Sequence, residues 1–292
     1  MNKKLIGTGV ALVTPFHKDG SIDFKGLGKL VEHVIKNGVD YLVPLGTTGE
    51  SVTLTKDEKT AVLDFILEVN NQRLPVVYGL GGNNTQEVIN CIQKMDFEGV
   101  DAVLSVCPYY NKPSQRGIYE HYKVIASACP VPVILYNVPG RTGLNMLPET
   151  TLKLAEEVTN IIAIKEASGN LEQMMQIIRN KPDDFMLISG DDALSLPIIA
   201  AGGQGVISVV ANVYPKDFSE MVRLCLKGEF EKARTLHYKL LEVTGLLFAD
   251  GNPAGAKAAL NILKICGEFL RLPLVEISKG TQTKLNAAMS AY

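Results

Sequence analysis

The first candidate for chemistry is a lysine that directly follows an apolar run. Residues 161–164 are Ile-Ile-Ala-Ile, which is typical of a strand directed into a protein interior, and Lys165 comes next. Lysine side chains are rarely buried, so the simplest interpretation is a solvated charge at a strand end. Between apolar walls, however, desolvation favours a neutral amine, which attacks carbonyl groups and forms a Schiff base. Lys165 is therefore either a surface charge or a nucleophile.

Three other apolar runs end in groups suited to binding a carboxylate or moving a proton. The turn "GTTGE" carries Thr47 and Thr48, whose hydroxyls and backbone N–H groups suit an anion; a turn with a threonine N-cap is the simpler alternative. "YNVPGRTG" places Tyr136 at a strand end and Arg141 on the next loop, where arginine either recognises a carboxylate or is solvated. The tyrosine pair in "CPYYNKPS" is more often core filler or an interface anchor.

A pair of carboxylates raises a metal-dependent alternative. "SGDD" ends another apolar run, and Asp191 and Asp192 together would suit a divalent cation in a metal-dependent aldolase or isomerase. A capping role before the next helix explains them more simply. No two of the four histidines lie at helical metal-ligand spacing. We therefore expect no metal site.

The elements that position these residues form a regular series. Short runs rich in Val, Ile and Leu recur without polar alternation, as in strands covered on both faces. Helical stretches separate them, for example at residues 56–70, 115–127 and 148–157. This alternation predicts an α/β fold, a (β/α)8 TIM barrel, in which catalytic groups lie at the C-terminal ends of the strands. The rival, an open doubly wound sheet, lacks a G-x-G-x-x-G after the first run. The eight runs begin at residues 9, 39, 74, 100, 131, 160, 185 and 204.

The strand signal stops after Val213. Residues 215–240 and 253–289 have a helical pattern, with breaks at Pro215, Gly228 and 251–253. We therefore expect a barrel at residues 1–214 and a C-terminal helical extension at 215–292 that packs on it.

Composition excludes several classes of protein. The net charge is −2 without a basic cluster, so nucleic acid and anionic membranes are not expected partners. No apolar run approaches the roughly 20 residues that span a bilayer. Gly7, Thr8 and Gly9 interrupt the stretch that resembles a signal peptide. Five scattered cysteines indicate a reducing compartment, and we expect the cytoplasm.

Together, "GTTGES", "CPYYNKPSQRGIYEHY", "LYNVPGRTG", "IKEASGN" and "LISGDD" resemble the dihydrodipicolinate synthase family, within the superfamily of N-acetylneuraminate lyase. The resemblance covers Gly7 to about Pro253 and departs locally in "FADGNPAGAKAAL". It implies a class I aldolase that condenses pyruvate with L-aspartate 4-semialdehyde through a lysine Schiff base, without a cofactor, in lysine and diaminopimelate biosynthesis. It also implies a homotetramer built as a dimer of dimers.

The resemblance also implies roles for individual residues. Lys165 would form the Schiff base, and Thr47, Tyr136 and Tyr110 would relay protons, with Tyr110 inserted from a neighbouring subunit. Thr48 would hold the pyruvate carboxylate, and Arg141 would meet the carboxylate of the semialdehyde. Two further residues would border the pocket, Gly190 and Ile207.

A feedback site for lysine is implied at the dimer interface. Lys56 and Lys59 stand where lysine-sensitive enzymes of the family carry histidines. We therefore predict weak or no inhibition by lysine. The matching positions are Ser51, Asn83, Glu87 and Tyr109.

Three other functions remain open from the residues. Another pyruvate-dependent aldolase of the superfamily would use the same lysine with a sugar-acid substrate. A metal-dependent barrel enzyme would use the "GDD" carboxylates. A non-catalytic binding barrel would leave Lys165, Tyr136 and Thr47 at strand ends by coincidence.

Overall fold

The computed structural model describes residues 3–292 and contains a single eight-stranded parallel sheet. The strands are hydrogen-bonded in the order β2-β1-β8-β7-β6-β5-β4-β3. A parallel bridge between Leu42 and Val76 joins the two ends of this order, so the sheet closes into a barrel. The predicted TIM barrel is confirmed. The strands are β1 Gly7–Ala11, β2 Tyr41–Val43, β3 Val77–Gly79, β4 Ala102–Val106, β5 Val133–Asn137, β6 Ile161–Glu166, β7 Met186–Ser189 and β8 Gly205–Ser208.

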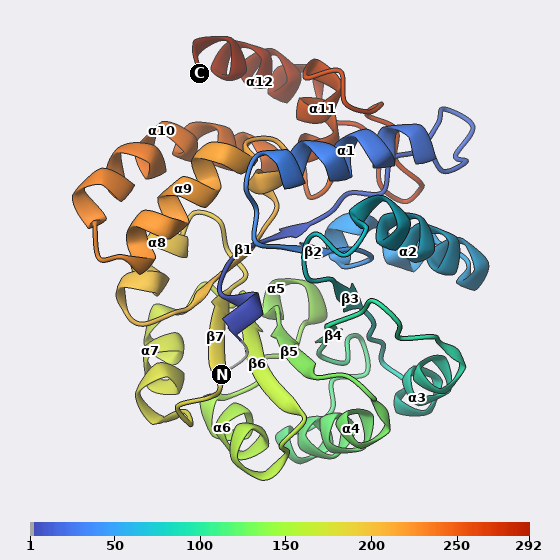
Figure 1. Ribbon diagram of the computed structural model, residues 1–292, viewed down its shortest axis with the longest axis vertical. Helices are drawn as coiled ribbons and strands as arrows, with labels where there is room; N and C mark the ends of the chain where they lie inside the picture. The colour runs from blue at the N-terminus through green and yellow to red at the C-terminus, as the bar shows by residue number, and fades with distance from the viewer. Residues whose placement is uncertain (1–2) are drawn as a thin grey trace.

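Helices follow the strands and surround them, as Figure 1 shows. The predicted helix at 56–70 is α2, and its first turn is fixed by a capping box in which Thr55 and Glu58 exchange hydrogen bonds. The predicted helices at 115–127 and 148–157 are also present. The helices of this part of the chain are α1 Phe24–Lys36, α2 Lys56–Asn70, α3 Thr85–Lys94, α4 Gln115–Ala128, α5 Pro139–Thr142, α6 Pro148–Glu157, α7 Leu171–Asn180, α8 Ser195–Ala200 and α9 Pro215–Leu226.

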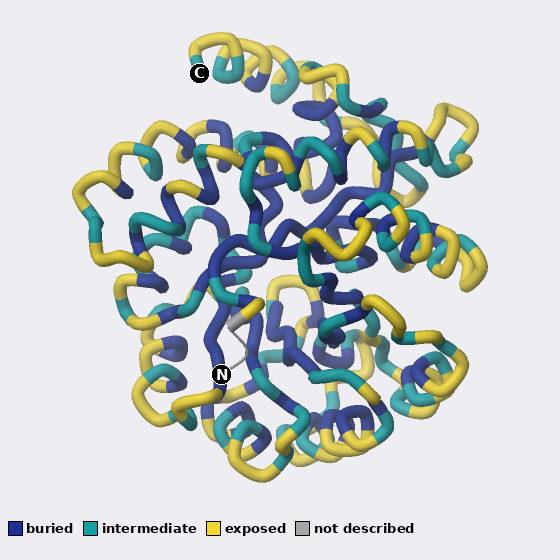
Figure 2. The backbone as a smooth tube through the Cα atoms, viewed as in Figure 1, coloured by how far each residue is buried: buried dark blue, intermediate teal, exposed yellow. Residues whose placement is uncertain are grey.

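Side chains alternate along each strand between the barrel interior and the surrounding helices. On β5, Ile134 and Tyr136 join the inner cluster, whereas Val133 and Leu135 pack in the cluster toward the helices. Both faces are therefore apolar, which explains why the strands lack polar alternation. Figure 2 shows the buried strands at the centre and the exposed outer surfaces of the helices.

The C-terminal part is helical but contains one segment that we predicted wrongly. Helix α10 is Phe230–Phe248, α11 is Ala254–Ile262 and α12 is Lys279–Ala291. Residues 263–278 form turns and extended chain, not helix. Gly267 and Pro273 interrupt this segment, and Arg271 within it is anchored by contacts to the barrel. Figure 1 shows α11 and α12 at the outside of the ring of helices, on the side of α1.

Helix α9 belongs by its contacts to the ring around the barrel, because it packs against α8, β1 and β8. The division of the chain at residues 214 and 215 stays a prediction. The first strand is shifted from the predicted run, which began at residue 9. It begins at Gly7 and ends at Ala11, before Pro15, which has no N–H to donate to a ladder. No helix described by the structure is long and apolar enough to cross a membrane.

Candidate active site

The predicted site residues gather at one end of the barrel. Because all the strands are parallel, their C-terminal ends meet at one mouth. Thr47 and Thr48 begin a 3-10 turn after β2. Tyr136 is the second-last residue of β5, and Lys165 is the second-last residue of β6. Gly190 directly follows β7. Ile207 lies next to the last residue of β8, Tyr110 lies in the loop after β4, and Arg141 is in α5, which follows β5.

Lys165 is buried and lies against Tyr136. The two residues are register partners on β6 and β5, and the Nζ atom of Lys165 is 4.3 Å from the centre of the Tyr136 ring. Only 6% of Lys165 is exposed, and no carboxylate of residues 3–292 lies within salt-bridge distance of its Nζ. The interpretation as a solvated edge charge is therefore wrong. An amine in this position is desolvated, unpaired and directed into the mouth.

Gly190 leaves room for the lysine side chain. A Cβ atom at position 190 would lie 3.1 Å from the Lys165 Cε atom and 2.6 Å from the Ala167 Cβ atom. Any larger residue would displace one of them. The Gly190 backbone N–H donates to the Glu166 carbonyl oxygen at 2.8 Å, which ties the end of β7 to the end of β6.

Two buried polar residues that we did not predict hold these strand ends together. Asn137 and Glu166 follow Tyr136 and Lys165, are register partners, and point away from the barrel interior. The Asn137 Nδ2 atom donates to the Glu166 Oε2 atom at 3.0 Å, and Gln173 Nε2 donates to the same oxygen at 2.9 Å. The Ser168 N–H donates to Glu166 Oε1 at 2.8 Å. The available signal was an amide and a carboxylate at positions adjacent to Tyr136 and Lys165, at the ends of strands that are otherwise apolar.

The threonine turn has an unusual backbone and a distant partner. Leu45 and Glu50, on either side of it, both have left-handed backbone angles, φ 60° and 51°. Thr48 is buried, and its Oγ1 atom accepts a hydrogen bond from Asn252 Nδ2 at 3.0 Å. Asn252 lies just before α11, and we predicted only a chain break there.

The two carboxylates of "SGDD" are used inside the protein. Asp191 accepts a hydrogen bond from the Leu194 N–H at 3.1 Å, which closes the turn before α8 without being its N-cap. Asp192 is buried and accepts hydrogen bonds from the Ser208 hydroxyl and the Val209 N–H at the end of β8. Burial raises the pKa of Asp192 to about 6. Within residues 3–292 no three His, Cys, Asp or Glu side chains converge as metal ligands, so the metal-dependent alternative gains no support.

Tyr110 lies outside the mouth of its own chain. It is 89% exposed and has a left-handed backbone angle, φ 71°. The loop is nevertheless fixed, since the Asn83 side chain donates to the Tyr109 carbonyl oxygen at 3.1 Å and the Asn111 side chain donates to the Asn83 carbonyl oxygen at 2.9 Å. Tyr110 lines an open surface hollow with residues of α3 and α4, among them Gln86, Ile89 and Val124.

The remaining predicted residues lie on the surface around this region. Arg141 is exposed at the end of α5 and makes no ion pair with any residue that the structure describes. Lys56 is the first residue of α2, and Lys59 lies one turn later. Glu87 is exposed in the first turn of α3, and Ser51 begins a 3-10 turn after Glu50.

The sequence also matches a model of a known protein family. The model described as the dihydrodipicolinate synthetase family matches residues 4–292. The chain belongs to this family. Its members are lyases of the class I aldolase type, and so is this protein.

Relatives of known name match over nearly the full length. The chain is 53% identical to the 4-hydroxy-tetrahydrodipicolinate synthase of Parabacteroides distasonis, over 98% of this chain and 96% of that protein. A structure of the chloride-inhibited synthase from Acinetobacter baumannii complexed with pyruvate is 40% identical, with a TM-score of 0.95 and 98% of each chain covered. The synthase from Cyanidioschyzon merolae with lysine bound is 42% identical, with a TM-score of 0.95 and coverage of 99% and 98%.

Proposed function

We propose that the protein condenses pyruvate with L-aspartate 4-semialdehyde, as a 4-hydroxy-tetrahydrodipicolinate synthase, through a Schiff base on Lys165. One observation carries the proposal: Lys165 is buried at a strand end against Tyr136, and no carboxylate of residues 3–292 pairs with it. Relatives of this name and a pyruvate complex of a structural neighbour support the choice of substrates. The product belongs to lysine and diaminopimelate biosynthesis.

The reaction follows from the chemistry of the amine. The Nζ atom of Lys165 attacks the pyruvate ketone, and loss of water gives an iminium. The methyl group then loses a proton and forms an enamine, whose carbon attacks the aldehyde carbon of the semialdehyde. The amino group of the semialdehyde finally attacks the iminium carbon, which closes the ring and releases Lys165. Each step moves a proton and needs a positioned hydroxyl.

The proposed roles use the other strand ends. Thr48 holds the pyruvate carboxylate through its hydroxyl and backbone N–H, while Gly190 and Ile207 border the pyruvate. Thr47 and Tyr136 relay protons together with Tyr110 from a neighbouring subunit. Arg141 binds the carboxylate of the semialdehyde. The guanidinium of Arg141 is exposed and forms no ion pair with the part of the chain that the structure describes, which supports this role.

Tyr110 makes the site dependent on assembly. A tyrosine that is 89% exposed on a hydrogen-bonded loop is suited to enter a second copy of the chain. We include in the proposal a homotetramer built from two tight dimers. We also place the enzyme in the cytoplasm, which its five free cysteines support.

Borohydride reduction in the presence of pyruvate tests the mechanism. It should add one reduced pyruvate per chain, and peptide mass analysis should find it on Lys165. Lys257 is an internal control, because it is also buried but pairs with a carboxylate. Labelling of Lys257, or no labelling, would overturn the proposal.

The aldehyde substrate needs a separate assay. A coupled assay with pyruvate and aspartate semialdehyde should show turnover that a chelator does not reduce. Labelling of Lys165 without use of the semialdehyde would favour the alternative, an aldolase of the superfamily that acts on a sugar acid.

A further inference from the structure

We propose that Asn252 is a positioning residue for the pyruvate carboxylate, acting through the hydroxyl of Thr48. This inference rests on the proposed function and adds a residue to it from the C-terminal region. Asn252 Nδ2 donates to Thr48 Oγ1 at 3.0 Å, and the two residues are 204 positions apart in the chain.

The direction of this hydrogen bond decides what Thr48 can offer a ligand. A threonine hydroxyl has one proton to donate and two lone pairs that accept. Because Asn252 supplies a proton to one lone pair, the hydroxyl keeps its own proton for another acceptor. A carboxylate is an acceptor only, so the arrangement presents to pyruvate the one group that it can use.

Burial makes the arrangement specific. Thr48 is 3% exposed and Asn252 is 7% exposed, so bulk water does not compete for their hydrogen bond. The amide oxygen of Asn252 has no hydrogen-bond partner among the residues that the structure describes. The side-chain amide of Asn252 is therefore oriented by one hydrogen bond, which it donates to the hydroxyl of Thr48.

A buried ion pair holds Asn252 and the threonine turn at a fixed distance. Lys257, five residues after Asn252, pairs with Glu50, two residues after Thr48, at 2.5 Å, and both side chains are fully buried. Glu50 has a left-handed backbone angle, which such contacts must stabilise. The C-terminal region thus contacts the turn at two points, Asn252 to Thr48 and Lys257 to Glu50.

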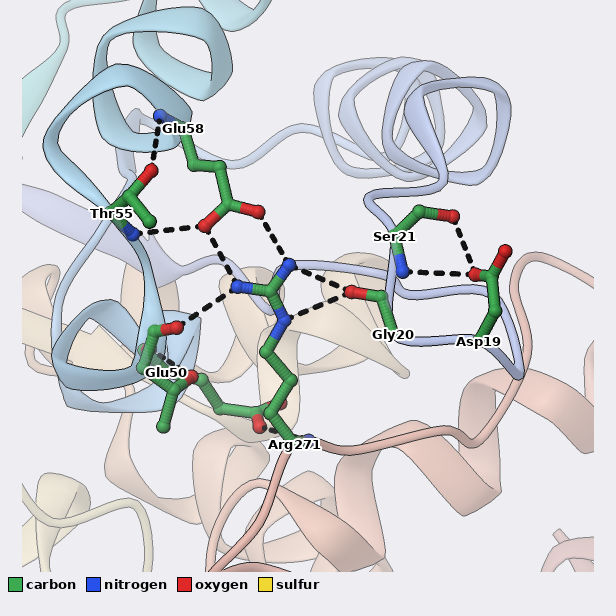
Figure 3. Close-up of polar contacts among 8 residues, drawn as sticks. Asp19, Gly20, Ser21, Glu50, Thr55, Glu58 and Arg271 are labelled. Carbon is green, nitrogen blue, oxygen red and sulfur yellow. Dashed lines mark hydrogen bonds and ion pairs between the residues drawn. The ribbon is translucent and has the colours of Figure 1, made fainter.

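Arg271 adds a third point of attachment, shown in Figure 3. Its backbone N–H donates to Glu50 Oε2 at 3.1 Å, and its guanidinium forms an ion pair with Glu58 in the first turn of α2. The guanidinium also donates to the carbonyl oxygen of Gly20. It donates as well to the carbonyl oxygen of Thr53. The C-terminal region that carries Asn252 is consequently fastened to the residues that follow the threonine turn and to the loop between β1 and α1.

Two substitutions of Asn252 test the proposal in the full-length enzyme. Asn252→Ala removes the donor that orients the Thr48 hydroxyl toward the pyruvate carboxylate. Loss of this one hydrogen bond should raise the KM for pyruvate about tenfold. Asn252→Asp keeps the shape but accepts the Thr48 proton and adds a negative charge, so the KM should rise about a hundredfold or more. The KM for the semialdehyde should change less than about twofold, because its binding does not use Thr48. A residue with a merely structural role would not separate the two substrates.

Two controls make the result decisive. In a Thr48→Val background, Asn252→Ala should add little, because the group through which it acts is already absent. Lowering the pH should reduce the difference in the KM for pyruvate between Asn252→Asp and Asn252→Ala. A protonated Asp side chain can donate a hydrogen bond to Thr48 again. Thermal unfolding shows whether each variant folds; if Asn252→Ala does not, the isosteric Asp variant carries the test.

The outcomes distinguish this inference from the proposed function. An unchanged KM for pyruvate in folded variants, or equal loss for both substrates, overturns the role of Asn252 while labelling of Lys165 persists. Absence of labelling in the unmodified enzyme would instead defeat the proposed function itself.

Discussion

The Nζ atom of Lys165 lies 4.3 Å above the ring of Tyr136, and the two residues are direct neighbours in the ladder between β6 and β5. The next pair in the same ladder, Glu166 and Asn137, lies on the opposite face and is joined by a buried hydrogen bond. Because successive side chains alternate between faces, the outer pair fixes the register that brings the inner pair together. A shift of one strand by one residue would break both pairs, because it would place Lys165 opposite Asn137 or Glu166 opposite Tyr136.

This relationship predicts that Glu166→Gln impairs catalysis without touching substrate. The Gln amide would place a donor against the donors of Asn137 and Gln173, leaving buried groups unpaired at a cost of about 1–3 kcal/mol. If relief of this cost displaces Lys165 and raises the activation free energy by the same amount, the kcat should fall roughly tenfold or more. Steady-state kinetics and the rate of borohydride trapping measure the effect.

Two variants control for a general loss of structure. Glu172→Gln removes an exposed carboxylate from α7 and should behave like the unmodified enzyme. The double variant Glu166→Gln with Gln173→Glu restores one carboxylate to the network and should recover part of the kcat. Full activity of folded Glu166→Gln would contradict the positioning role.

Arg141→Ala should separate the two substrates. The guanidinium has no ion-pair partner in residues 3–292 and is expected to bind the semialdehyde carboxylate. A charge-assisted hydrogen bond contributes about 1.5–3 kcal/mol, so use of the semialdehyde should weaken roughly ten- to a hundredfold. Trapping of pyruvate on Lys165 should survive. Arg179→Ala, at the far end of α7, is the control, and equal loss of both functions would refute the assignment.

Subunit mixing tests the placement of Tyr110. Tyr110→Phe and Lys165→Ala should each be inactive, but a hybrid dimer holds one complete site if Tyr110 acts across the interface. Random exchange should restore about a quarter of the activity, since half of the dimers are hybrids with one good site of two. Mixing Lys165→Ala with Tyr136→Phe should restore none. No recovery in the first mixture, with exchange demonstrated by mass, would place Tyr110 in its own chain's site.

Lysine should inhibit this enzyme weakly or not at all. Lys56 is exposed and Lys59 is half-buried at the start of α2, near the predicted effector site. A like charge at 4 Å costs about 1 kcal/mol in water and about 4 at an effective dielectric of 20, equivalent to about ten- to a thousandfold in affinity. Long lysine side chains can turn their ammonium groups into solvent, which favours the low end of this range. Tight inhibition in a lysine titration would overturn the prediction.

A reciprocal substitution tests the cause. Replacing both lysines, Lys56→His and Lys59→His, should increase inhibition by lysine. The exposed Lys216→His on α9 is a matched control that should leave the titration unchanged.

Asp192 should make stability depend on pH below neutrality. Burial raises its pKa from 3.8 to about 6, so its neutral form is the one that folding favours. The associated stability is present below the unfolded pKa and is lost as the pH rises through about 6, a change of about 3 kcal/mol. Denaturant unfolding of the enzyme and of Asp192→Asn, at one protein concentration, should show that the difference between their free energies of unfolding changes between pH 3.8 and about 6. If the two free energies of unfolding change with pH in parallel, the prediction is contradicted.

Much of the fold was predictable because its signal is local. Runs of Val, Ile and Leu without polar alternation indicated strands buried on both faces, and the helix at residues 56–70 carried its own cap. A parallel barrel brings its strand ends together, so Lys165, Tyr136 and Thr47 were expected near one another before any contact was known. The segment 263–278 was missed because its conformation depends on contacts made by Arg271, not on its own pattern.

By itself, the sequence determined the barrel, the end of the barrel that carries chemistry and the amine that attacks the carbonyl. Only the tertiary structure decided that Lys165 has no carboxylate partner within residues 3–292, that the hydrogen bond between Asn137 and Glu166 fixes its register, and that Asn252 reaches Thr48 from 204 residues away. Periodicity records which face of an element is buried, because burial acts on each side chain in turn. A hydrogen bond requires two distant groups to come within about 3 Å, and chain folding alone sets that distance.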